Sequence, residues 1–220
     1  MKETALLMFG PPNSGKGTYG RRIAGLLERK YICAGDLIRE QLDEDEGWFE
    51  GRYSWEKMND GKFLPFDLMC ALIRKHIERA SGSCVVDGFP RDIDQLGEFE
   101  AWEMPYSALW IEHEDELLIA RALSRMICSS CGKIYSRGNP HMETGPDDSC
   151  VSCGGTVARR SDDEEDVARG RLELYRQVTQ PIKSRCIDGA IAFKEVSPEG
   201  GDVDQIAAEM AEEARDMLIP

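Results

Sequence analysis

Positive charge and long apolar runs are both scarce in this chain. Its 220 residues carry 27 Lys and Arg against 41 Asp and Glu, which gives a formal net charge of -14. A protein that follows a phosphate backbone needs a basic surface, so this balance disfavours nucleic acid as a partner. No apolar run approaches the roughly 20 residues that span a bilayer, and the first residues lack a basic stretch followed by an apolar one. We therefore expect a cytoplasmic protein with neither a membrane nor a nucleic-acid partner.

The eight cysteines divide into two kinds. Four occur singly in apolar or helical stretches and are predicted to be buried thiols: Cys33, Cys70, Cys84 and Cys186. The other four form two C-x-x-C pairs that enclose eighteen residues: Cys128 with Cys131, and Cys150 with Cys153. This spacing is typical of a tetrahedral thiolate site with only protein ligands, so we predict a structural Zn²⁺. A labile dithiol pair and four free thiols are the alternatives.

Residues 10–18 have the pattern G-x-x-x-x-G-K-G-T. They follow an apolar run at 4–9 and precede a helical pattern, which is the strand, glycine loop and helix context of a P-loop. In such a loop, backbone N–H groups and the positive end of a helix dipole face phosphate oxygens, and Lys16 adds a full charge. The hydroxyl expected directly after the lysine is displaced by one position, to Thr18.

Short apolar segments alternate with longer helical patterns along the chain. Strands are predicted at 5–9, 84–86, 108–111 and 191–196, with a weaker candidate at 31–33. Helices are predicted at 15–28, 36–42, 65–79, 92–102, 114–126, 164–185 and 203–217. This alternation predicts an α/β fold, in which helices cover both faces of a parallel sheet.

Two segments interrupt the alternation. Residues 43–61 begin with four consecutive acids and continue with four aromatic residues: Trp48, Phe49, Tyr53 and Trp55. We predict that the acids form a solvated face and that the rings pack in a small core, although they could line a ligand pocket or a subunit interface. Residues 128–160 are rich in Gly, Pro, Ser and Cys and too long for an unsupported loop, so something must hold this segment together.

A second polar motif follows the predicted strand 84–86. The sequence V-V-D-G-F-P-R-D places Asp87 at the end of the strand and Arg91 after a tight turn. Open α/β sheets bind ligands at the carboxyl ends of their strands, so we expect both side chains to face the same crevice as the P-loop. Asp87 is suited to the water shell of Mg²⁺, and Arg91 is suited to a bidentate contact with a phosphate.

On the basis of these motifs, the sequence resembles the adenylate kinase and nucleoside monophosphate kinase family over nearly the whole chain. The displaced hydroxyl in G-K-G-T is the form that this family uses. Four further segments resemble the family in the expected order: 34–39, 61–65, 87–91 with Gln95, and 160–163 with Arg171 and Tyr175. The last of these is similar to the hinge that returns from a zinc-bearing lid.

The resemblance implies a three-layer P-loop NTPase fold with a central five-stranded parallel sheet and three parts. The core would comprise residues 1–33, 65–126 and 161–220, the nucleoside-monophosphate-binding insert 34–64, and the zinc-binding lid 127–160. The implied activity is reversible, Mg²⁺-dependent transfer of the γ-phosphoryl group from ATP to AMP, giving two ADP. We expect a monomer, with an oligomer as the alternative.

The resemblance also implies which residues form the site. The catalytic groups would be Lys16, Asp87, Arg91, Arg125, Arg160 and Arg171. The residues that contact ATP would be Gly10, Asn13, Ser14, Gly15, Lys16, Gly17, Thr18, Arg121 and Arg125. The residues that contact AMP would be Ala34, Arg39, Phe63, Leu64, Gly88, Arg91, Gln95, Arg160 and Arg171. Forked, always-charged arginines explain how an acidic protein can bind polyanions.

The acceptor nucleotide depends on two positions. Ala34 stands where adenylate kinases usually carry threonine, and an S-A-G-D form resembles relatives that accept UMP or CMP. Gln95 stands where adenylate kinases read the adenine edge. We therefore predict AMP, with a UMP/CMP or broad-specificity kinase as the alternative. A more remote alternative is a nucleotide-gated protein whose C-x-x-C pairs form a zinc ribbon that recruits a partner.

Overall fold

A computed structural model of the chain describes residues 4–59, 62, 64–139, 142–159, 164–189, 191–198 and 200–218. The chain forms two compact units. The first comprises Met1–Gly10, Gly15–Glu112 and Arg176–Pro220, and the second comprises Pro11–Ser14 and His113–Tyr175. Each unit is described by itself.

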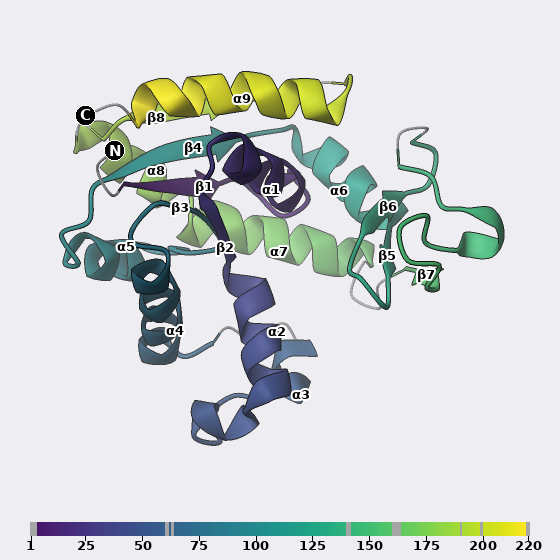
Figure 1. The fold of residues 1–220 in the computed structure, drawn as a ribbon, viewed down its shortest axis with the longest axis horizontal. Coiled ribbons are helices and arrows are strands. Elements are labelled where there is room, and N and C mark those ends of the chain that lie inside the picture. Colours follow the sequence, from purple (N-terminus) through teal and green to yellow (C-terminus); the bar gives the residue numbers. More distant parts are fainter. Residues whose placement is uncertain are drawn as a thin grey trace. The chain divides into compact units, whose positions relative to one another are not determined.

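The first unit is built on a five-stranded sheet (Figure 1). Its strands are β1 (Ala5–Phe9), β2 (Lys30–Cys33), β3 (Cys84–Asp87), β4 (Tyr106–Ile111) and β8 (Phe193–Val196). They lie in the order β2-β3-β1-β4-β8, and every pairing is parallel. This is the central sheet of the P-loop NTPase fold, so the predicted fold class is confirmed, and the weaker candidate strand at 31–33 is part of it.

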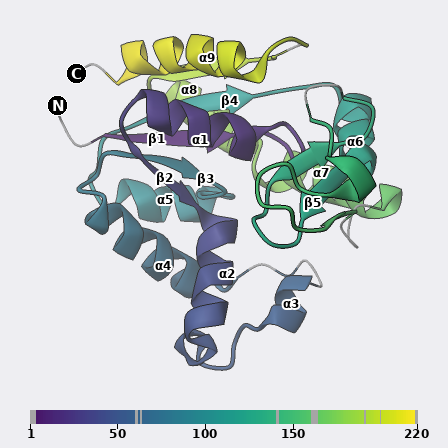
Figure 2. The same ribbon diagram turned by 45° about the vertical axis from the view of Figure 1, so that its right-hand side comes forward.

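Helices cover both faces of this sheet. On one face, α1 (Lys16–Leu26) and α9 (Val203–Met217) lie side by side, and Ile23 and Met210 pack with Leu6 of β1 in one buried cluster (Figure 2). On the other face lie α4 (Phe66–Arg79), α5 (Ile93–Glu100) and α8 (Pro181–Asp188). There Phe9 stacks on Trp110 with 4.8 Å between ring centroids. The three central strands, β3, β1 and β4, are almost fully buried as a result of this two-sided cover, whereas the edge strands β2 and β8 are partly exposed.

Three short helices follow β2: α2 (Ala34–Glu44), the 3₁₀ helix η1 (Glu46–Phe49) and α3 (Trp55–Asn59). Phe49 is 0% exposed and contacts the rings of Trp48 and Tyr53, so the predicted packing role of this ring is confirmed. Trp55, by contrast, is 36% exposed. The acids at 43–46 are all exposed, as expected of a solvated face.

The second unit contains α6 (Asp115–Ser124), β5 (Arg125–Cys128), β6 (Ile134–Ser136), the 3₁₀ helix η2 (Pro146–Asp148) and β7 (Val157–Ala158). Its three strands form an antiparallel sheet in the order β6-β5-β7. A further helix, α7 (Glu165–Val178), begins in this unit and ends in the first.

Two of the differences between predicted and observed helices have an identifiable physical cause. The helix predicted at 114–126 stops at Ser124, because Arg125 adopts extended backbone and pairs with Ser136 in the small sheet. The helix predicted at 164–185 is divided into α7 and α8, because Pro181 lacks the N–H that would continue the helix and instead begins α8. Within the described residues, no helix is both long and apolar enough to span a membrane.

Candidate functional site

The N-terminus of α1 starts directly after the glycine loop. Gly15 precedes the helix with φ 94°, and a Cβ at this position would lie 2.9 Å from the ring of Tyr19. Only glycine fits both constraints. The first turn of α1 contains no acidic residue, so the helix dipole leaves this end positive. Of the loop residues in the second unit, Asn13 has φ 66° and Ser14 donates its N–H to Pro11 O at 3.2 Å.

Lys16 is the cation of the loop. Its Nζ donates a hydrogen bond to Gly10 O at 2.6 Å. Burial lowers the pKa of Lys16 below its ordinary value, and the nearby carboxylate of Asp87 offsets part of this shift. A partly buried ammonium next to a helix N-terminus is a concentrated positive site suited to phosphate oxygens.

Asp87 is the last residue of β3 and lies beside Met8 and Cys33 of the neighbouring strands. Its side chain is polar but only 6% of the residue is exposed. The hydroxyl of Tyr31 donates a hydrogen bond to Asp87 Oδ2 at 2.7 Å. Asp87 therefore sits in a nearly buried position at the carboxyl end of the sheet, within reach of the electrostatic field of Lys16.

Gly88 and Arg91 lie in the loop after β3, and Gln95 lies in α5 directly after this loop. Arg91 Nε donates to Gly88 O at 2.8 Å, and the backbone N–H of Arg91 donates to Gln95 Oε1 at 2.9 Å. A Cβ at Gly88 would lie 3.4 Å from both Arg91 Nη2 and Ala34 Cβ. The structure therefore brings together four of the residues predicted to hold the acceptor, Ala34, Gly88, Arg91 and Gln95. Leu64, a fifth, is buried just before α4.

Asp36 joins two arginines near the start of α2. It accepts a hydrogen bond from Arg21 at 2.5 Å through Oδ2 and another from Arg39 through Oδ1. Burial alone would raise the pKa of Asp36, but the hydrogen bond from Arg21 and the charge of Arg39 lower it below its ordinary value. The ionised carboxylate orients Arg39, whose guanidinium lies beside Gly35.

Three of the predicted phosphate-binding arginines belong to the second unit. Arg121 lies in the last turn of α6, Arg125 is the first residue of β5, and Arg171 lies within α7; all three are partly buried. Arg160 and Phe63, also predicted for the site, lie outside the described residues. The roles of all these residues stay predictions.

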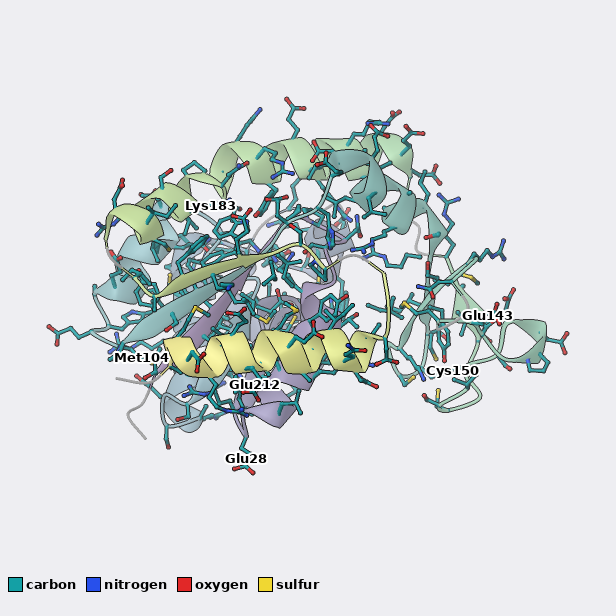
Figure 3. All side chains as sticks on the ribbon, turned by 90° about the horizontal axis from the view of Figure 1, so that it is seen from above. Glu28, Met104, Glu143, Cys150, Lys183 and Glu212 are labelled. Atoms are coloured by element: carbon teal, nitrogen blue, oxygen red, sulfur yellow. The ribbon has the colours of Figure 1, made fainter. Side chains whose placement is uncertain are left out.

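The four paired cysteines form one cluster. All four Sγ atoms lie within 4.8 Å of one another, with Cys128 and Cys153 at 3.5 Å and Cys131 and Cys150 at 3.6 Å. Figure 3 labels Cys150 among the sulfur atoms of this region. Four cysteine sulfurs, with no further candidate ligand in this group among the described residues, match the set that binds Zn²⁺ in closed structural sites, so the residues fit this metal. The cluster is compatible with a zinc-bearing lid.

Hydrogen bonds to sulfur lower the pKa of two of these cysteines, Cys128 and Cys150, whereas hydrogen bonds to the neighbouring thiols raise the pKa of Cys153 to about 12. The hydroxyl of Tyr135 donates to Cys150 Sγ at 3.0 Å and lowers the pKa of Cys150 to about 6. Backbone N–H groups of Cys131 and Ser130 lower the pKa of Cys128, although burial opposes them. Donors around a ligand sulfur are the second shell expected of a metal site.

A comparison with known families and proteins agrees with this geometry. The family described as "Adenylate kinase" matches residues 8–185 of this chain. The chain belongs to the adenylate kinase family. It is therefore a nucleoside monophosphate kinase, a nucleotide-binding enzyme of the transferase class.

Relatives named adenylate kinase match most of the chain. The protein from Symbiobacterium thermophilum is 34% identical over 187 residues, which cover 80% of this chain and 83% of the relative. The protein from Petrotoga mobilis is 30% identical over 207 residues, which cover 88% of this chain and 94% of the relative. The protein from Chlamydia pneumoniae is 30% identical over 187 residues, covering 82% and 84%.

Sequence reasoning about this adenylate kinase family member missed three contacts. They are the hydrogen bond of Tyr31 to Asp87, that of Arg21 to Asp36, and that of Thr179 Oγ1 to Arg91 O at 2.6 Å. For Tyr31 the sequence did contain one signal. Gly17 and Gly20 lie three residues apart on one face of α1, and two glycines at this spacing indicate that another side chain, here that of Tyr31, packs closely against the helix. For Thr179, 88 residues from Arg91, the sequence holds no local signal.

Proposed function

We propose that this protein catalyses reversible, Mg²⁺-dependent transfer of the γ-phosphoryl group of ATP to AMP, giving two ADP. The observation that carries the proposal is the cluster at the carboxyl end of β3. There Asp87, whose charge acts on the P-loop cation Lys16, is followed by Arg91 in the next loop and by Gln95 in α5. A donor-phosphate site and an acceptor site are thus joined by one short segment, and the related proteins are named adenylate kinase.

The donor half of the reaction needs positioning and charge more than covalent chemistry. In the proposed complex, the backbone of the loop 10–18 binds the phosphates. Lys16 stabilises the negative charge that develops on the β- and γ-phosphate oxygens during transfer. Arg121, Arg125, Arg160 and Arg171 supply further fixed positive charge. These roles rest on the family resemblance and, for Arg121, Arg125 and Arg171, on the position of each in its own element.

Asp87 is the residue that fits Mg²⁺. It is a hard oxygen donor in a nearly buried position, and its Oδ2 is already oriented by a hydrogen bond. Bound together with ATP, Mg²⁺ would supply charge neutralisation at the phosphates. Asp87 would hold the ion through its water shell.

The acceptor half is proposed to use Arg39 and Arg91 for the phosphate and Gln95 for the base. The Arg91 N–H fixes Gln95 Oε1 as an acceptor, so the amide offers a hydrogen-bond donor and an acceptor in one set order. Adenine presents a complementary pair at N1 and N6. Ala34, in contact range of the Arg91 turn, is the observation that favours UMP or CMP, which remains the second candidate.

We further propose a core of residues 1–33, 65–126 and 161–220, an insert at 34–64 that binds the monophosphate, and a lid at 127–160 that holds a structural Zn²⁺ through Cys128, Cys131, Cys150 and Cys153. Among the described residues, the buried cluster of the lid contains only Cys128, Tyr135, Cys150 and Val157, with Met126 just before it, so the lid needs the metal to stay folded as one body. Its function would be to exclude water, which competes with AMP for the phosphoryl group.

A coupled assay with Mg-ATP and each of AMP, UMP, CMP and GMP tests the proposal. We expect AMP to give the highest kcat/KM and the product to be two molecules of ADP for each AMP consumed. Faster turnover of UMP or CMP than of AMP would reassign the acceptor. If no monophosphate were phosphorylated while ATP still bound, the reaction itself would be refuted in favour of a nucleotide-gated binding protein.

A further inference from the structure

Tyr31 connects the edge of the sheet to the candidate magnesium ligand. It lies on β2, next to β3 in the sheet, and its hydroxyl donates to Asp87 Oδ2 at 2.7 Å. We propose that Tyr31 is a positioning residue that orients the Asp87 carboxylate for the hydrated Mg²⁺ of the Mg-ATP complex. This inference rests on the proposed function, because it assigns Asp87 to that complex.

The Tyr31 ring is held in place from several sides. A Cβ at Gly20 of α1 would lie 2.7 Å from Tyr31 Cε2, and a Cβ at Gly17 would lie 3.7 Å from the hydroxyl. The guanidinium of Arg21 lies over the ring, 4.8 Å from its centroid. The ring therefore sits in a slot that the glycines of α1 leave open. A ring confined in this way holds its hydroxyl at one position.

The hydrogen bond has a definite consequence for the carboxylate. Tyr31 occupies Oδ2, and among the described residues no hydrogen bond reaches Oδ1. The carboxylate thus presents Oδ1 in one orientation, rather than rotating about its last torsion. A tyrosine hydroxyl keeps its proton at neutral pH, since the ordinary pKa of this group is about 10. The hydroxyl is therefore a permanent neutral donor.

Such a neutral donor suits a magnesium ligand better than a cation would. A lysine or arginine at this position would form an ion pair with Asp87 and compete with Mg²⁺ for its charge. The tyrosine hydroxyl orients the carboxylate and leaves its full negative charge for the metal complex. Orientation without neutralisation is the specific contribution that we assign to Tyr31.

The substitution Tyr31→Phe removes the hydroxyl and keeps the ring in its slot. A matched control is Tyr106→Phe on β4, where the hydroxyl donates to Glu100 Oε1 at 2.8 Å. Calorimetric titration measures the affinity for ATP once in the presence of Mg²⁺ and once in EDTA. The ratio of these two affinities is called here the Mg²⁺ gain. One oriented hydrogen bond contributes roughly 0.5–1.5 kcal/mol, so we expect Tyr31→Phe to lower this gain about 3- to 10-fold. The affinity without Mg²⁺ should be unchanged, and Tyr106→Phe should behave as wild type.

Two further measurements separate positioning from general structure. In a double-mutant cycle, Tyr31→Phe should have no additional effect on the Mg²⁺ gain once Asp87→Asn is present. In the phosphoryl-transfer assay, Tyr31→Phe should raise the Mg²⁺ concentration needed for half-maximal rate and leave KM for AMP unchanged.

The titrations decide the inference independently of the reaction. An unchanged Mg²⁺ gain in Tyr31→Phe, an equal loss in Tyr106→Phe, or full additivity with Asp87→Asn would overturn it. If the wild-type enzyme phosphorylated no monophosphate, the proposed function would fail, and the Mg²⁺ gain in ATP affinity would still support or overturn the role of Tyr31.

Discussion

The hydroxyl of Thr179 donates a hydrogen bond to the backbone carbonyl oxygen of Arg91 at 2.6 Å. On its other side, the Arg91 N–H donates to Gln95 Oε1. The backbone of Arg91 is therefore held from two directions, by the turn between α7 and α8 and by α5. An arginine that is proposed to bind the acceptor phosphate is positioned through its main chain, not only through its guanidinium.

Substitution Thr179→Val removes this hydroxyl and keeps the shape of the side chain. The carbonyl of Arg91 loses its partner, so we expect KM for AMP to rise about 3- to 10-fold, with a smaller change in KM for ATP. Thr179→Ser keeps the hydroxyl and serves as the control, with a KM for AMP near that of wild type. Steady-state kinetics with AMP and ATP varied separately measures both. Equal behaviour of the valine and serine variants would show that the hydrogen bond does not position Arg91 for the acceptor.

Gly20 and Gly25 of α1 should respond oppositely to alanine. A Cβ at Gly20 would lie 2.7 Å from Tyr31 and 2.8 Å from Met8 Sδ, whereas a Cβ at Gly25 would meet no described atom within 4 Å apart from the adjoining backbone of its own helix. Gly25→Ala should therefore stabilise the helix by up to about 1 kcal/mol. Gly20→Ala should destabilise the fold by about 1–2 kcal/mol, since overpacking outweighs the gain in propensity. Urea unfolding measures both; stabilisation by Gly20→Ala would mean that Tyr31 is not confined by α1.

Lys16→Met should separate activity from stability. Loss of the cation at the phosphates should reduce kcat by about 10²- to 10³-fold or more. At pH 7 the variant should be at least as stable as wild type, because it no longer buries a charge. Normal turnover by this variant would contradict the role of Lys16.

The same lysine predicts a pH dependence of stability. Burial lowers its folded-state pKa below the ordinary 10.5, so between these two values the unfolded state binds more protons than the folded state. The free energy of unfolding contributed by this group therefore rises with pH through that window. Urea unfolding of wild type and Lys16→Met at a series of alkaline pH values should show this rise in wild type only. A parallel pH dependence in both proteins would assign it to other groups.

Removing Cys153 should release the metal. Cys153→Ser leaves three thiolates, so we expect elemental analysis to find one zinc per chain in wild type and much less in the variant. Its thermal unfolding temperature should fall, and activity should fall less steeply than metal content. Ser152→Ala, in the same turn with all four thiolates kept, is the control and should retain zinc. Wild-type protein free of metal would refute the zinc site.

What the sequence by itself determined is local. Three features depend only on residues that are close together in the sequence. They are the glycine loop with Lys16, the alternation of strands and helices, and the spacing within the C-x-x-C pairs. Their physical requirements, a positive φ before a helix, a buried apolar strand and a turn between two thiolates, are also local. These features were enough to identify the P-loop fold, the family resemblance and the cysteine cluster.

The boundaries of two helices were not predictable in the same way. Arg125 is extended and not helical because it pairs with Ser136 in the small sheet. At Pro181 the helix breaks, although the amphipathic pattern of the sequence continues through this position. In both places, a partner or a missing backbone N–H outweighs side-chain periodicity. Periodicity reports which face is apolar, and it carries little information about where backbone hydrogen bonding stops.

Only the tertiary structure decided how the candidate site is held together. Tyr31 and Asp87 are 56 residues apart, and Thr179 and Arg91 are 88 residues apart. Their contacts depend on the order β2-β3-β1-β4-β8, which sets side by side strands that are distant in the chain. A hydrogen bond requires two atoms within about 3 Å, and no pattern in the sequence specifies distances of that kind between remote segments. The sequence therefore determined which chemical groups the site contains, and the packing of the sheet and helices determined how those groups are oriented.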